Sequence, residues 1–270
     1  MQNTTDIQKP DLVSPISKAL HILDIVGDAD QSMRFQDLSE LLPFPRATTH
    51  RLLKLLVSER MLAFDDNRRT YRLGHRLFQQ AHRSWARNSM TEIAGPYLTE
   101  LCRQTGLTVH LATLEGGNVL YLDKRLPHRP VTMFSNPGRI ASAYCTGLGK
   151  ALLASLDQSA MEEAIALQSY KAYTAKTLTS QEMLKAALIK IQQKGLAYDD
   201  EEHEVGILCL AMALPDLEKS TLPHAISITS TVLQGSLVEL EQRCAETLKT
   251  ITIQISEKAR AGLMPGQGQD

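Results

Sequence analysis

The sequence predicts an α+β protein made of two domains that a helix joins. Its 270 residues exceed the roughly 100–200 residues of a typical single domain. Hydrophobic residues recur at helical spacing in the N-terminal third, whereas after Met90 helices are interspersed with short segments of strand composition. Since those segments are joined as hairpins rather than as repeated βαβ units, we expect a mainly antiparallel sheet in the second domain.

The charge of the chain is divided unevenly, although the net charge is only -1. The segment Arg34–Arg87 carries eleven Lys and Arg against five Asp and Glu, and residues 91–270 carry sixteen against twenty. The first part is therefore net +6 and the second net -4. A basic module attached to a mildly acidic one is typical of a DNA-binding head on a body with another role.

Three helices are expected in the head, residues 14–76. Ser14–Pro15 provides an N-cap followed by proline at the first helical position, and Gly27–Asp28 ends this helix. A second helix covers Phe35–Leu42 and stops before a proline, because proline disfavours helix in the residue that precedes it. Pro45 can open a third helix.

The third helix is expected to have one packing face and one free face. The packing face is apolar apart from one threonine and comprises Thr49, Leu52, Leu53 and Leu56. The opposite face is mostly polar and basic and comprises Ala47, His50, Arg51 and Lys54. The candidate DNA-contacting residues carry donor or cationic groups on this helix and on the hairpin after it: Arg46, Thr48, Thr49, His50, Arg51, Lys54, Arg68 and Arg69.

A basic hairpin follows the third helix. After Met61 the segment LAFDDNRRTYRLG gives a short strand, a turn with two arginines and a second strand. Three helices and a basic hairpin in this order predict a winged helix-turn-helix, whose third helix lies in the major groove while the wing contacts the DNA backbone. A small helical domain with a surface hairpin is the alternative, and the basic free face favours DNA binding.

Residues 77–89 are expected to form a linker helix between the head and the body. Its apolar stripe of Leu77, Phe78, Ala81 and Trp85 has no obvious partner in the head and would supply contacts between two copies of the chain. For Trp85, a place in the core is the alternative.

The body, residues 90–262, is expected to contain one sheet and several helices. A helix ends at Gly106, another begins at Gly147, and a final amphipathic helix covers about 237–261. Two more helices are expected near 158–168 and 180–194. The expected strands are 109–115, 118–125, 131–134, 196–202, 206–214 and 224–229.

The segment Gly147–Lys150 has only part of a phosphate-binding loop. That loop needs glycine five residues before its Gly-Lys pair and Ser or Thr after it, but the chain has Tyr144 and Ala151 there. What remains is a glycine-rich helix start whose free backbone N–H groups can hold a small anion. A tight turn needed for packing is the alternative.

The acidic run Asp199–Glu204 lacks the pattern of a calcium loop, because the sixth position of an EF-hand loop is glycine and here is Glu204. We expect most of the run to be a solvated loop, with Asp199 at the end of its strand facing inward. No Cys-x-x-Cys, His-Glu-x-x-His or Gly-x-Ser-x-Gly motif is present, and Cys209 has only His203 as a candidate partner. We therefore expect no catalytic residue, metal or cofactor.

Cysteine spacing and hydropathy bear on the compartment. Cys102, Cys145, Cys209 and Cys244 are far apart, so we expect free thiols, as in a reducing cytosol. No apolar run approaches the ~18 residues of a membrane span, and the start MQNTTDIQKP lacks the features of a signal peptide. The protein is therefore expected in the cytoplasm, with no membrane partner.

Five segments together resemble the IclR family of bacterial transcription regulators: PISKALHILDIV, PRATTHRLLKLL, YRLGHRL, CTGLGKALLA and AYDDEEHEVGILCLA. The likeness covers Ser14 to about Ala261 in the family's order. It implies a winged helix-turn-helix head, a GAF-like effector-binding body, and dimers or dimers of dimers on palindromic operators. It also implies repression of a nearby catabolic operon as the usual role. For the effector, the residues themselves lead us to expect an organic or aromatic acid.

The resemblance further implies that six residues line the effector cavity: Gly147, Leu148, Asp199, Cys209, Ser227 and Thr229. We expect Met133 in the same cavity. For Cys209, structural burial is the alternative. Two positions depart from the family pattern. Ala47 stands where a serine is common near the start of the reading helix, and Leu148 replaces a small residue, which would narrow or reshape the cavity. The alternative functions are a GAF-like sensor or hydrolase enzyme, whose motifs are missing, and a protein-interaction adaptor, which leaves the basic wing unexplained.

Overall fold

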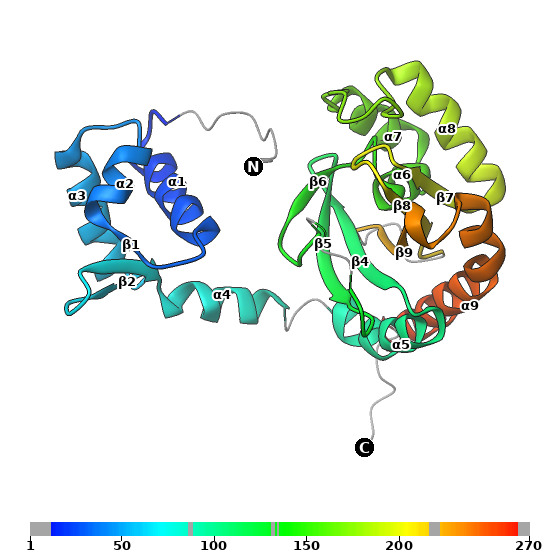
Figure 1. The fold of residues 1–270 in the computed structure, drawn as a ribbon, viewed down its shortest axis with the longest axis horizontal. Helices are drawn as coiled ribbons and strands as arrows, with labels where there is room; N and C mark the ends of the chain where they lie inside the picture. The colour runs from blue at the N-terminus through cyan, green and yellow to red at the C-terminus, as the bar shows by residue number, and fades with distance from the viewer. Residues whose placement is uncertain (1–11, 86–88, 131–132, 134, 216–221, 264–270) are drawn as a thin grey trace. The chain divides into compact units, whose positions relative to one another are not determined.

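The computed structural model describes residues 12–85, 89–130, 133, 135–215 and 222–263. The chain divides into two compact units, the head up to Asn88 and the body from Ser89 onward (Figure 1). None of the helices in the described ranges has the length and apolarity that a membrane crossing requires.

Up to the end of the wing, the described part of the head consists of three helices packed with a small antiparallel sheet. Its elements up to the wing are α1 (Pro15–Asp28), β1 (Met33–Arg34), α2 (Phe35–Leu41), α3 (Arg46–Ser58), β2 (Leu62–Asp65) and β3 (Thr70–Leu73). The strands pair in the order β1-β3-β2, so that β2 and β3 form the predicted hairpin. The helices enclose a core of aliphatic side chains, with Ile22, Leu38 and Leu53 fully buried.

Local sequence signals set the bounds of the helices in the head. Ser14 caps α1 as expected, because its Oγ accepts from the N–H of Ser17 at 3.0 Å while Ser17 Oγ accepts from the N–H of Ser14 at 3.2 Å. The helix ends at Asp28, where the sequence predicted its end. Pro45 is the N-cap of α3 and not its first residue, so this detail of the prediction is wrong.

The helix α4 (His75–Trp85) lies in the stretch expected to be the linker helix. It begins at His75 rather than at residue 77, and Leu77 packs against the core of the head, where no partner was expected for it. Phe78 is exposed and stacks on His82, with ring centroids 6.2 Å apart. Residues 86–88 and the side chain of Trp85 lie outside the described part of the chain.

The body is built on one sheet with strand order β6-β5-β4-β9-β8-β7, all pairs being antiparallel. Its elements are α5 (Ser89–Thr105), β4 (Thr108–Glu115), β5 (Asn118–Arg125), β6 (Ile140–Ser142), α6 (Gly147–Ala154), α7 (Gln158–Ala166), α8 (Gln181–Lys194), β7 (Ala197–Asp200), β8 (Ile207–Ala213), β9 (His224–Thr231), the short 3-10 helix η1 (Val232–Gln234) and α9 (Leu237–Leu263). Of the strand expected at 131–134, residues 131, 132 and 134 lie outside the described part, and Met133 is not in a strand.

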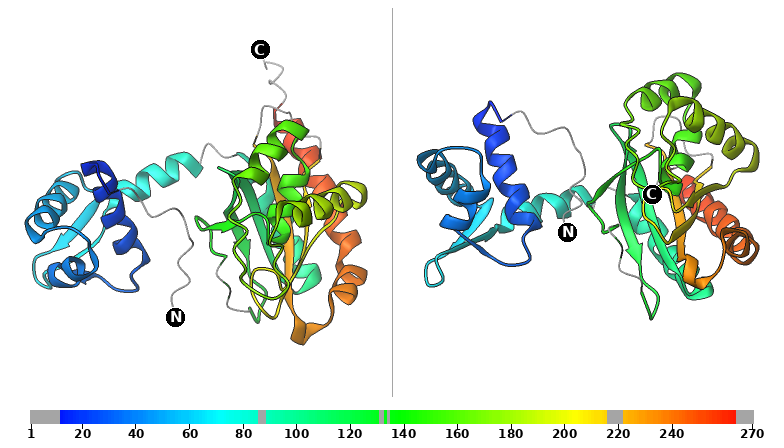
Figure 2. Two further views of the ribbon diagram at one scale, coloured as in Figure 1. Left: turned by 90° about the horizontal axis from the view of Figure 1, so that it is seen from above. Right: turned by 45° about the horizontal axis from the view of Figure 1, so that its top comes forward.

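Helices cover both faces of the sheet (Figures 1 and 2). On one face α5 and α9 lie side by side and form a core that includes Leu98 and Leu248. On the other face α6, α7 and α8 form a second core that includes Leu152 and Ile165. All four cysteines are buried free thiols, as expected. The candidate site of the body lies on the α6 face.

Candidate functional site

The packing face of α3 holds this helix in the head. Thr49, Leu52, Leu53 and Leu56 are all buried, as the helical spacing predicts. Thr49 is fully buried, and its Oγ1 donates to the carbonyl oxygen of Pro45 at 3.4 Å. The prediction that Thr49 contacts DNA is therefore wrong, because its place on the helix faces the core.

The opposite face of α3 is open to solvent. Its members Ala47, His50, Arg51 and Lys54 are all exposed. Next to them, Arg46 is also exposed and Thr48 is half-buried. The ring of His50 packs edge-on against Phe35 of α2, with centroids 5.9 Å apart, which fixes its position. Within the described part of the chain, the three cationic side chains on this face form no ion pair. Their positive charge is therefore available to an external partner.

The turn between β2 and β3 presents two exposed arginines. Asp65 Oδ1 accepts from the N–H groups of Asn67 at 2.9 Å and Arg68 at 3.0 Å, and the bond from Arg68 holds the pKa of Asp65 below its ordinary value. Arg69 has a φ of 56°, in the left-handed region, and its guanidinium lies 5.3 Å from the centre of the Phe64 ring. The tip of the wing is thus a shaped, positively charged turn.

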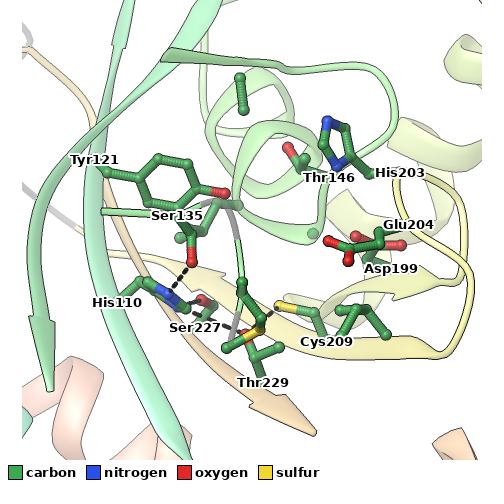
Figure 3. A pocket seen from close by; sticks show the side chains of 15 residues that line it. His110, Tyr121, Ser135, Thr146, Asp199, His203, Glu204, Cys209, Ser227 and Thr229 are labelled. Carbon is green, nitrogen blue, oxygen red and sulfur yellow. Dashed lines mark hydrogen bonds between the residues drawn. The ribbon is translucent and has the colours of Figure 1, made fainter. Parts of the chain in front are cut away.

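A cavity lies between α6 and the sheet of the body (Figure 3). All seven candidate effector-binding residues line this cavity: Met133, Gly147, Leu148, Asp199, Cys209, Ser227 and Thr229. The residues that the sequence did not assign to it are His110, Tyr121, Ser135, Ala141, Thr146, His203, Glu204 and Ile207. The described lining therefore includes two carboxylates, and no lysine or arginine.

The glycine-rich segment begins α6, with Thr146 as its N-cap. Thr146 Oγ1 accepts from the N–H of Gly149 at 3.2 Å, whereas the N–H groups of Gly147 and Leu148 have no hydrogen-bond partner among the described residues. A Cβ on Gly149 would lie 2.3 Å from the backbone of Ala143, so packing alone requires this glycine. The packing alternative therefore holds for Gly149, while two free donors remain at the cavity wall.

Asp199 is the buried carboxyl group of the cavity. It pairs with Cys209 in the sheet, is 5% exposed, and accepts the N–H of Glu202 on Oδ1 at 2.8 Å. Burial, and then the charge of Glu202, raise the pKa of Asp199 to about 7. Near neutral pH this group can therefore act as a neutral donor or as an anionic acceptor.

A buried ion pair supports the loop at this end of the cavity. Lys150 of α6 pairs with Glu202, and both side chains are buried. The loop is also held by Thr177 Oγ1, which donates to the carbonyl oxygen of Glu202 at 2.6 Å, and by Thr174 Oγ1, which donates to that of Glu201 at 2.7 Å. The prediction of a solvated loop is therefore wrong for Glu202. Its carboxylate is buried because it is the counter-charge that the buried Lys150 requires.

His110 is a cavity residue that the sequence reasoning missed. It lies on β4 directly opposite Ser227 of β9 and is 2% exposed. Its Nε2 is 2.8 Å from Ser135 Oγ, and its Nδ1 is 3.4 Å from Ser227 Oγ and 3.5 Å from Thr229 Oγ1. Burial lowers the pKa of His110 to about 3, so the imidazole is neutral. Ser227 and Thr229 lie on the same face of β9, and His110 pairs with Ser227. This strand pairing is the signal that could have placed His110 in the cavity.

The thiol of Cys209 does not have the environment of a nucleophile. Burial raises its pKa to about 12, and Thr229 Oγ1 donates to Sγ at 3.6 Å. The neutral imidazole of His110, which contacts the same threonine, supplies no charge to stabilise a thiolate. His203, the partner considered from sequence, lines the cavity without a hydrogen bond to this thiol. The arrangement suits binding rather than thiol catalysis.

The fold and these two sites define a class of protein. A small head with a basic reading helix and a basic wing, followed by a body with a polar cavity, is the design of a DNA-binding transcription regulator. The IclR helix-turn-helix domain matches residues 15–66, and the C-terminal domain of the bacterial transcriptional regulator IclR matches residues 82–257. The chain belongs to the IclR family of transcription regulators, and it is a regulator rather than an enzyme.

Individual relatives agree with this assignment. The transcriptional regulator XynR of Escherichia coli is 30% identical over 229 residues, which are 85% of this chain and 90% of the relative. The structure of the Thermotoga maritima IclR has a TM-score of 0.75 at 25% identity and covers 90% of this chain and 97% of its own. An IclR homologue from Microbacterium hydrocarbonoxydans, in complex with 4-hydroxybenzoate, has a TM-score of 0.78 at 20% identity, with coverages of 92% and 100%. The predicted winged helix-turn-helix head and antiparallel α+β body are thus confirmed.

Proposed function

We propose that this protein represses a catabolic operon and that a small organic or aromatic acid, bound in the cavity of the body, changes its affinity for operator DNA. The observation that carries the proposal is the pair of backbone N–H groups of Gly147 and Leu148 that begin α6 at the cavity wall without a partner among the described residues. Donors at a helix N-terminus stabilise an anion through hydrogen bonds and through the helix dipole. They can hold a carboxylate although the described lining contains no lysine or arginine.

The cavity suits an acid larger than a two-carbon acid. The buried side chain of Leu148 adds apolar surface that a ligand of glyoxylate size would leave uncovered. Ser227 and Thr229 offer hydroxyls for a second polar group of the ligand, whereas Asp199, whose backbone lies close to Gly147, offers its carboxyl group at the α6 end. We therefore favour a larger hydroxy- or keto-acid, or an aromatic acid. The homologue from Microbacterium hydrocarbonoxydans, which has the same fold, is in complex with an acid of this size, 4-hydroxybenzoate.

On DNA, we assign base reading to Arg51 and backbone contacts to Arg68 and Arg69. Arg51 is exposed on the free face of α3, and a guanidinium can donate two parallel hydrogen bonds to guanine. The wing arginines are exposed on a shaped turn and would contact phosphates, which carry no sequence information. The interface is completed by the other polar residues at this side of α3: Arg46, Thr48, His50 and Lys54.

A single reading helix per chain is too small a readout for a unique genomic site, so we expect two chains on a pseudo-palindromic operator. A homodimer or a dimer of dimers meets this requirement. The stretch around α4 links the body to the head and is the element through which the effector would act. The effector changes operator affinity only as far as it prefers one dimer geometry, since coupling is a difference in affinity and is reciprocal.

The test measures operator affinity with and without candidate acids. The DNA that flanks the protein's own gene serves as the operator in electrophoretic shift experiments, with a panel of hydroxy-, keto- and aromatic acids. Asp199→Ala combined with Ser227→Ala should abolish the response to the active acid and leave unliganded DNA binding within a few-fold of wild type. An intact response in this variant would place the effector site elsewhere, and sedimentation of a monomer on the operator would refute the dimer.

A further inference from the structure

One end of the cavity takes no part in holding an anion at α6. We call it the hydroxyl end, and it consists of His110, Tyr121, Ser135, Ser227 and Thr229. Figure 3 shows His110 and Ser135 on one side of the cavity, with Asp199 and Glu204 on the other. A ligand that spans the cavity would therefore meet two chemically different ends.

We propose that His110 is a specificity-determining residue that recognises a hydroxyl group of the effector. The inference rests on the proposed acid effector and defines its second functional group. The bound molecule is then a hydroxy acid, with its carboxylate at the start of α6 and its hydroxyl among the groups of the hydroxyl end.

The chemistry of His110 suits the recognition of a hydroxyl. Its imidazole is neutral in this buried place and therefore has one donor nitrogen and one acceptor nitrogen. Both nitrogens face hydroxyl groups, of Ser135 on one side and of Ser227 and Thr229 on the other. Each hydroxyl can donate or accept, so the whole set can reverse its direction to suit a ligand that donates or accepts.

The hydrogen-bonding capacity of this end is only partly used. The contacts of His110 Nδ1, at 3.4 and 3.5 Å, are long, whereas the contact of Nε2 with Ser135 is 2.8 Å. A ligand oxygen placed near Nδ1 could form a shorter bond than either hydroxyl of β9.

Tyr121 supplies an independent observation at the same end. Its side chain is only 8% exposed, its ring packs against His110 with centroids 5.4 Å apart, and Figure 3 shows its hydroxyl pointing into the cavity. This hydroxyl has no hydrogen-bond partner among the described residues, and burial raises the pKa of Tyr121, so it stays a phenol. The hydroxyl therefore keeps its capacity to donate and to accept a hydrogen bond for a ligand or a water in the cavity. A ligand hydroxyl would satisfy it together with His110.

The experiment compares acids that differ only in the hydroxyl. Binding of 4-hydroxybenzoate against benzoate, and of 4-hydroxybutyrate against butyrate, is measured by titration calorimetry on the full-length protein. At least one hydroxy acid should bind wild type about tenfold more tightly than its partner, the effect of one well-made hydrogen bond. In His110→Phe the ratio of the two affinities should fall to near one. The affinity for the hydroxy acid should fall, and that for the acid without the hydroxyl should stay the same.

Further variants separate recognition from a structural role. His110→Asn places an amide where Nδ1 lies and should keep most of the preference. Tyr121→Phe removes one hydroxyl, keeps the ring and should lower the preference severalfold, which tests the hydroxyl end even if His110→Phe does not fold. Tyr198→Phe is the control, because the hydroxyl of this half-buried tyrosine lies outside the cavity and donates to Glu241 Oε2 at 2.9 Å. It should leave the preference unchanged.

Four outcomes are possible. Loss of the preference in His110→Phe and its reduction in Tyr121→Phe support the inference. If acids bind but wild type shows no hydroxyl preference, or if both variants keep it, the inference is overturned while the proposed acid effector stands. If other acids of the hydroxy-, keto- and aromatic panel bind but neither hydroxy acid does, the inference is overturned while the acid effector stands. If no acid of the panel binds, the acid effector is refuted and the inference with it.

Discussion

The variant Asp199→Asn should become progressively more stable than the wild type as the pH rises above about 4. The folded protein raises the pKa of Asp199 from 3.8 to about 7, chiefly through burial. The native carboxyl group therefore keeps its proton up to a higher pH than the unfolded chain does. Between these two values the native state binds more protons, so the free energy of unfolding of the wild type falls with rising pH. Asparagine carries no such proton, and its Oδ1 can still accept the N–H of Glu202.

The magnitude follows from the shift. A difference of about three pKa units, at 1.36 kcal/mol per unit, amounts to about 4 kcal/mol once the carboxyl group is ionised in both states. About 1–2 kcal/mol of this is already present at pH 5, so the stability of Asp199→Asn relative to wild type should rise by about 2–3 kcal/mol from pH 5 to pH 8. Urea unfolding followed by far-ultraviolet circular dichroism at several pH values measures this difference.

The neighbouring carboxylate provides a matched control. Asp200 lies next along β7, and its side chain is 46% exposed and pairs with Lys176 at 3.0 Å. Asp200→Asn therefore removes a carboxylate from the same strand, but one that is not buried. Its stability relative to wild type should not rise between pH 5 and pH 8 as that of Asp199→Asn does. A relative stability of Asp199→Asn that is constant between pH 5 and pH 8 would refute the reasoning. It would mean that Lys150, rather than burial, governs the ionisation of Asp199.

Four other substitutions test the head and the buried ion pair. Arg51→Ala should lower the preference for operator over random DNA by about 1–3 kcal/mol. Arg69→Ala should weaken binding to both DNAs alike in competition titrations. It should also reduce the slope of log affinity against log salt concentration by up to about one unit. If Arg51→Ala left the preference for operator unchanged, the base contact would move to His50 or Thr48. Lys150→Met should cost about 3–5 kcal/mol in urea unfolding, because it leaves Glu202 buried without a counter-charge. Adding Glu202→Leu should recover most of that loss, and a single-variant cost below about 1 kcal/mol would contradict this.

The elements with strong local signals could be predicted from the sequence. The N-cap at Ser14 places the start of α1 at the predicted residue, and Gly195, with φ of 73°, ends α8 where the pattern stopped. The sequence did not predict β1 and β6, which have two and three residues. The alternation of apolar and polar residues that marks a strand repeats every two residues, so segments this short do not show it. Among the candidate cavity residues, Gly147 and Asp199 could be placed because both lie at the ends of well-marked elements.

The missed parts of the site depend on contacts between distant segments. Nearly all of β4 is buried on both faces, so its sequence shows no alternation that would reveal the cavity side of His110. The register of β4 against β5 shifts between Leu111 and Ala112, and this irregularity pairs Tyr121 with Ala112, on the same face as His110. The counter-charge of Glu202 is Lys150, which is 52 positions away along the chain. No local pattern carries information of these kinds.

The separation of the two cores by the sheet has a consequence for how this protein can diversify. The core under α5 and α9 contains none of the cavity residues, whereas α6 and the strand side chains that face it supply most of the lining. Substitutions that reshape the cavity therefore fall on one face, while the opposite face keeps its full set of buried aliphatic contacts. The side chains of the cavity can therefore change one at a time without loss of the folded body between steps.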